Sequence, residues 1–142
     1  LGILGIGPPA VAGPRLERTA RLYAGPRRKR VLPAMELIAV IVTAAPGGDG
    51  RHRFRQDTAT IRRYLRAARR ARALLILDIQ PGRSDFPTEA RALEPFLAEP
   101  DVGLALDPEW RMRPGEVPGR DPRQHPEGGR RAGGLAVRDS GG

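Results

Sequence analysis

Carboxylate and amide side chains follow two strongly apolar runs of this 142-residue chain. Asp78 and Gln80 close the run ALLILDIQ, while Asp107 and Glu109 come directly after the run VGLAL. Residues two apart in a strand share a face, so Asp78 lies on the same face as Gln80. Asp107 and Glu109 also share a face if that strand extends to residue 109. Two carboxylates placed on either side of a glycosidic bond can serve as general acid and as base or nucleophile. The pattern therefore predicts an acidic site at the ends of two strands.

The catalytic candidates are Asp78, Asp107 and Glu109, with Glu109 as the acid and one of the two aspartates as its partner. Polar and aromatic neighbours are the candidates for substrate binding, with the tryptophan as a platform for a sugar ring: Glu36, Gln80, Arg83, Trp110 and Arg111. A structural alternative stays open, in which these acids cap the following helices or pair with the two arginines. No histidine is placed to join them and the chain has no cysteine, so we expect neither a metal site nor a cofactor.

Apolar runs and amphipathic segments alternate along the chain, which predicts an α/β fold with a parallel sheet. Residues 31–43 and 73–80 are continuous apolar runs, typical of strands buried on both faces. Residues 58–72 place apolar side chains at helical spacing, with Asp57 or Thr58 as the cap, and Ser84 or Asp85 is expected to cap the next helix. The remaining expected elements are strands at 1–6 and 102–106 and helices at 11–23 and 88–97, the last kinked or restarted at Pro95.

The net charge of the chain is +9, and the positive charge is concentrated in its first half. Residues 1–72 hold 16 basic and 4 acidic residues, whereas residues 73–119 hold 4 basic and 9 acidic residues. All basic residues but Lys29 are arginine, which indicates GC-rich codons as much as phosphate binding. Aromatic residues that could stack on bases are not interleaved with the arginines. We therefore interpret the arginines of 58–72 as a solvated helix face, and nucleic-acid binding is the least favoured function.

Three segments resemble an uncharacterised family of actinobacterial proteins: VLPAMELIAVI at 31–41, LDIQPGRSDF at 77–86 and PDVGLALDPEWRM at 100–112. The resemblance covers residues 1–119. It implies a (β/α) barrel and a secreted or cell-surface location, although this chain shows no signal peptide. A complete barrel takes about 250 residues, so the expected fold is a partial TIM-barrel-like fragment with about four parallel strands. Such a fragment is expected to be inactive alone and to self-associate through its open sheet edges.

The resemblance stops at Arg120, and residues 120–142 show no periodicity. A shift of one nucleotide in the reading frame recovers a helix start similar to that of the family. Our hypothesis is that 120–142 is a disordered tail read out of frame. The domain organisation is then a partial barrel over 1–119 and a tail over 120–142.

Two functions remain open for the acidic site. The first is hydrolysis of a cell-surface carbohydrate by carboxylates at the strand ends, and the second is non-catalytic binding of a polysaccharide or cell wall. No apolar run reaches the roughly 18 residues that a membrane span needs.

Overall fold

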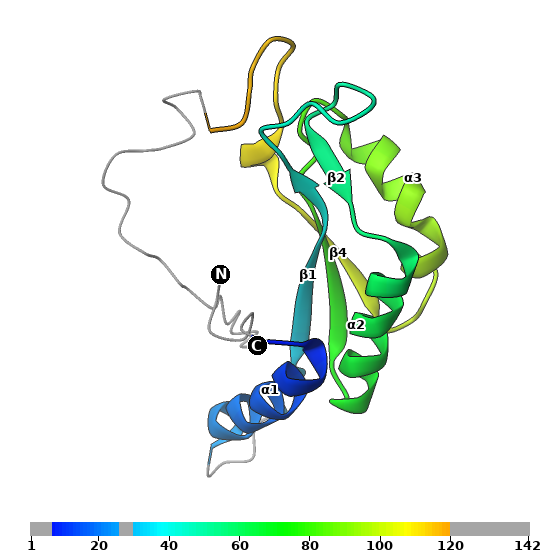
Figure 1. Ribbon diagram of the computed structural model, residues 1–142. Helices are drawn as coiled ribbons and strands as arrows, with labels where there is room; N and C mark the ends of the chain where they lie inside the picture. Colours follow the sequence, from blue (N-terminus) through cyan, green and yellow to red (C-terminus); the bar gives the residue numbers. More distant parts are fainter. Residues whose placement is uncertain (1–6, 26–29, 120–142) are drawn as a thin grey trace, which may run out of the picture.

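The computed structural model describes residues 7–25 and 30–119, and Figure 1 shows the arrangement of their helices and strands. The expected strand at 1–6 and the expected disordered tail at 120–142 lie outside these residues. No helix in the described ranges is long and apolar enough to cross a membrane. The elements, in chain order, are α1 (Pro9–Ala24), β1 (Ala34–Val42), β2 (Arg53–Arg55), α2 (Thr58–Arg70), β3 (Leu74–Ile79), α3 (Phe86–Leu97), β4 (Val102–Leu106) and a 3-10 turn (Pro108–Trp110).

Four strands form one open, mixed sheet in the order β2-β1-β3-β4. The three strands β1, β3 and β4 are parallel, as predicted, with Leu37 opposite Leu77 and Leu77 opposite Leu104. The expectation of about four parallel strands is corrected by β2, which pairs antiparallel with the end of β1. Sequence patterns missed β2 because its three residues, Arg53, Phe54 and Arg55, contain no apolar run.

Helices α2 and α3 cover the same face of this sheet (Figure 1), and the hydrophobic core lies beneath them. Alternate side chains of the two central strands fill it, including Leu37 of β1 and Leu75, Leu77 and Ile79 of β3. The helices contribute Ile61, Leu65, Ala68 and Leu93.

The other face of the sheet carries the intervening side chains, and it is less buried than the apolar runs predicted. Glu36 is exposed there, and Ile38 and Ile76 are only partly buried. Each central strand is therefore fully packed on one face only, which leaves polar groups room on the other.

Aspartate side chains cap both sheet-covering helices, as predicted, although α3 begins two residues earlier than the expected start at 88. Asp57 accepts a hydrogen bond from the Thr60 N–H at 2.6 Å, and Asp85 accepts one from the Thr88 N–H at 2.8 Å. The predicted restart at Pro95 is wrong, because α3 continues through this residue to Leu97. Pro95 stands in the last turn of the helix, where losing one backbone hydrogen bond costs less than in its middle.

Candidate functional site

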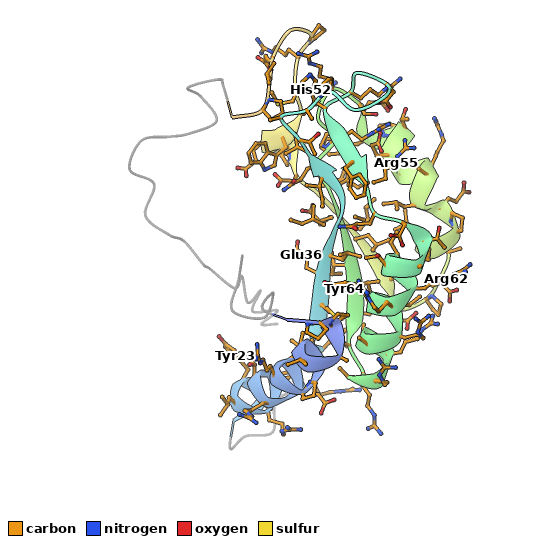
Figure 2. All side chains as sticks on the ribbon, in the orientation of Figure 1. Tyr23, Glu36, His52, Arg55, Arg62 and Tyr64 are labelled. Atoms are coloured by element: carbon orange, nitrogen blue, oxygen red, sulfur yellow. The ribbon has the colours of Figure 1, made fainter. Side chains whose placement is uncertain are left out.

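Three carboxylates lie on the sheet face that α2 and α3 leave uncovered. In the parallel register, Asp78 of β3 stands opposite Ile38 of β1, two residues after Glu36. Asp107 follows β4, and its N–H continues the parallel ladder by donating to the carbonyl oxygen of Ile79 at 3.0 Å. Figure 2 shows Glu36 projecting from β1 away from α2. Asp78 and Asp107 thus lie at the carboxyl ends of β3 and β4. Glu36 lies on the same face but nearer the amino end of β1, opposite Ile76.

Asp78 is the most perturbed acid of this group. Its residue is only 7% exposed, and no arginine or lysine of the described ranges forms an ion pair with it. Burial, followed by the negative charges of Asp107 and Glu36, raises the pKa of Asp78 to about 6, although the Ile79 N–H opposes the shift. A carboxyl group in such surroundings holds its proton close to neutral pH, which is what a general acid requires.

Gln80 ties three strand ends together beside Asp78. Its Oε1 accepts a hydrogen bond from the Val42 N–H at 3.3 Å, and its Nε2 donates to Oδ2 of Asp107 at 3.4 Å. The backbone N–H of Gln80 also donates to the carbonyl oxygen of Val40. One amide side chain therefore links the ends of β1, β3 and β4 and orients the carboxylate of Asp107.

Glu109 does not join this group as the sequence predicted. Strand β4 ends at Leu106, and Pro108–Trp110 form a 3-10 turn, so the two-residue alternation that would align Glu109 with Asp107 is lost. Proline at the start of the turn removes the N–H that a continuing strand would use. Glu109 is exposed and Trp110 is partly buried.

The two candidate arginines lie in the loops that follow the strands. Arg83 donates from Nε to the backbone oxygen of Glu116 at 2.8 Å, and Arg111 is exposed in a bridge opposite Gly82. Neither arginine forms an ion pair with Asp78 or Asp107, and Asp107 makes no capping hydrogen bond from its side chain. The structural alternative, in which the acids cap helices or pair with these arginines, is therefore not realised at Asp78 or Asp107.

A buried ion cluster at the start of α3 was missed from the sequence. Glu89 is 0% exposed, and its carboxylate accepts hydrogen bonds from Arg53 Nε at 2.7 Å and Arg55 Nε at 2.6 Å. Burial opposes its ionisation, but the hydrogen bonds from Arg55, Ser84 and Arg53 prevail and lower the pKa of Glu89. The spacing of Arg53 and Arg55, two apart in a strand, is the one sequence signal that would have placed both on one face.

Gly82 allows the loop after β3 to lie against the loop before β2. Its φ is +58°, and a Cβ atom here would stand 2.6 Å from the carbonyl oxygens of both Arg51 and His52. The N–H of Arg83 donates to the Arg51 oxygen at 2.8 Å, and the N–H of Met112 donates to the Gly82 oxygen at 2.7 Å. This close packing fixes the loops around the acidic group.

No three histidine, aspartate or glutamate side chains within 7–25 and 30–119 are arranged to hold a metal ion. Comparisons with protein-family models, with curated proteins and with solved structures find no match for the chain. The function must therefore be argued from the site itself.

Proposed function

We propose that this chain is part of a TIM-barrel-like (β/α) protein. The support is the strand order: β1, β3 and β4 advance in one direction, with both connecting helices on the same face. Parallel crossovers are right-handed, so an order that never reverses keeps every helix on one side, as in the wall of a barrel. A doubly wound sheet reverses its order and carries helices on both faces. In this arrangement Asp78 and Asp107 point toward the barrel interior, at the end where barrel enzymes bind substrate. Glu36 faces the same interior from further back along β1.

The proposed activity is hydrolysis of a carbohydrate, with Asp78 as general acid. The observation that carries it is the buried Asp78 carboxyl, whose pKa is raised to about 6, while the neighbouring side chain of Glu36 is exposed to solvent. Two carboxyl groups whose environments differ in this way can divide the roles of acid and of base or nucleophile. Asp107, held by Gln80, is then the partner. Asp78 replaces Glu109 as the acid, because Glu109 is exposed on the 3-10 turn.

The substrate class and the location follow from the resemblance of residues 1–119 to secreted actinobacterial proteins. A cell-surface polysaccharide is the carbohydrate that an exported protein meets. Trp110, partly buried directly after the site, offers an aromatic ring to a sugar. Arg83 and Arg111 border the same loops and offer donors to its hydroxyl groups.

The test uses protein from the complete reading frame of the gene, assayed on purified cell-wall polysaccharides for binding and for release of reducing ends. We expect Asp78→Asn and Asp107→Asn to lose about 100-fold or more in turnover while retaining binding. Glu109→Gln is the matched control and is expected to keep most of its turnover. The wild-type rate is expected to fall as the pH rises through about 6, because the acid then loses its proton.

Three other outcomes would decide against this proposal. Full turnover by Asp78→Asn would refute the general-acid role. Saturable polysaccharide binding without turnover by the wild-type protein would favour the non-catalytic binding function. Salt-sensitive binding to random DNA, with none to polysaccharide, would point to the arginine-rich helix instead.

A further inference from the structure

A groove between α2 and α3, on the side of the sheet opposite the acidic group, combines an apolar floor with free cations. It has a volume of about 470 Å³. Leu65, Ala92, Pro95 and Phe96 form its apolar lining, and Phe96 is only partly buried. Thr58, Arg62, Arg66, Arg69 and Glu99 complete the lining. Such a surface can take up apolar side chains and negative charge at the same time.

The cations of the groove are not equivalent. Arg69 is already neutralised, since it donates to Glu99 Oε2 at 2.8 Å and to Asp101 Oδ2 at 2.7 Å. Glu99 is the only acidic residue in the lining, and its carboxylate already forms an ion pair with Arg69. Arg62 and Arg66 are exposed and form no ion pair with an acid of the described ranges. Figure 2 shows Arg62 on the side of α2 that faces away from β1.

The spacing of the free arginines matches an acidic helix. Arg62 and Arg66 are four residues apart on α2, so their positions differ by about 6 Å along the helix axis. Two glutamates four residues apart on a partner helix have the same spacing and lie on one face of it. Apolar residues between them would then meet Pro95 and Phe96, the accessible apolar residues of the lining. A nucleic-acid backbone would meet the charges but would leave the apolar floor unused, so an acidic protein segment fits better.

We propose that the groove between α2 and α3 binds an acidic amphipathic helix of a partner protein through Arg62, Arg66 and the apolar surface formed by Pro95 and Phe96. This site is separate from the acidic group on the other face of the sheet. It does not depend on the proposed carbohydrate chemistry. The ligand carries carboxylates at helical spacing on either side of leucine-like side chains.

The test measures binding of a fluorescent helical peptide of about 16 residues, with glutamates four apart flanking leucines, to the whole chain at low salt. We expect saturable binding that Arg62→Gln/Arg66→Gln weakens about fivefold or more, because two exposed ion pairs are lost. Arg63→Gln/Arg70→Gln removes the same charge from the same helix outside this groove and is expected to change the affinity less than twofold. Circular dichroism of both variants checks that the fold is retained.

Two altered peptides and a DNA probe complete the test. Replacing the glutamates by glutamine, or the leucines by alanine, is expected to weaken binding. The proposal is overturned if the original peptide does not bind, if both double variants weaken it equally, or if the glutamine peptide binds as well. Tighter binding of a random DNA duplex, reduced equally by both double variants, would also overturn it and would indicate a general phosphate-binding surface.

Discussion

Replacing Asp78 by asparagine is expected to stabilise the protein at high pH and not at low pH. The pKa of Asp78 is raised to about 6 from an ordinary value of 3.8 by burial and by Asp107 and Glu36. Such a difference between folded and unfolded states corresponds to about 3 kcal/mol of folding free energy. Asparagine has nearly the same shape and no charge, so it removes that penalty.

The sign follows from the two protonation equilibria. Below about pH 3.8 the Asp78 carboxyl is neutral in both states, so it carries no ionisation penalty. Between pH 3.8 and about 6 the unfolded chain ionises first, so the folded state loses stability as the pH rises. Above about pH 6 the whole penalty is present. The free energy of unfolding of Asp78→Asn minus that of the wild type should therefore grow by up to about 3 kcal/mol between pH 4 and pH 8.

Urea unfolding followed by circular dichroism at pH 4, 5, 6, 7 and 8 measures this difference. Any fixed cost of the buried amide is the same at every pH and cancels from the trend. Asp101→Asn is the control of opposite sign, because hydrogen bonds from Arg69 lower the pKa of Asp101. Its variant should lose stability relative to the wild type as the pH rises. If the difference in unfolding free energy between Asp78→Asn and the wild type stays constant from pH 4 to pH 8, then burial and the neighbouring charges do not raise the pKa of Asp78.

Three further predictions concern the packing around the site. Glu89→Gln removes the buried carboxylate that Arg53 and Arg55 share, while Arg53 keeps Asp49 as a partner and Arg55 is partly exposed. It should therefore destabilise the fold by about 2 kcal/mol in urea unfolding; a loss below about 0.5 kcal/mol would contradict the ion cluster. Gly82→Ala should lower the melting temperature much more than Gly115→Ala, because both glycines have positive φ but only Gly82 has backbone oxygens in the way; equal losses would count against the close loop packing. Leu104→Gln/Leu106→Gln should reduce self-association in sedimentation, since both leucines are exposed on the edge strand β4; an unchanged oligomer distribution would exclude this edge as the contact.

The apolar runs predicted the parallel strands well, because residues on the helix-covered face of the sheet are buried and must therefore be apolar. Leu75, Leu77 and Ile79 are fully buried under the helices, and their chemistry is visible in the sequence. The caps at Asp57 and Asp85 were also predictable, since capping is local. In contrast, β2 depends on a long-range pairing with β1 and on the reach of its arginines to Glu89, which no local pattern records.

The sequence predicted that acids gather at the strand ends, but it did not predict which acids lie together. The period of two puts Asp78 of β3 and Gln80, which directly follows β3, on one face, and Gln80 contacts Asp107 after β4 because parallel strands end at the same edge. Glu109 was misjudged because Pro108 ends the strand and turns the chain into a 3-10 turn. The raised pKa of Asp78 depends on its burial and on the charges of Asp107, which follows β4, and Glu36 of β1. Such coupling appears only once the strands are brought together.

The parallel strands β1, β3 and β4 follow one another in one direction across the sheet, while the short strand β2 pairs with the other edge of β1. From β1 through β3 to β4, each strand is placed by the same crossover, and the last strand leaves its outer hydrogen-bonding edge without a strand among the described residues. A further strand placed by the same rule would pair with the free edge of β4, and its helix would lie beside α3 over the exposed Leu104 and Leu106. In the barrel that we propose, the number of such units would decide whether the acidic face stays open or becomes the lining of a closed ring.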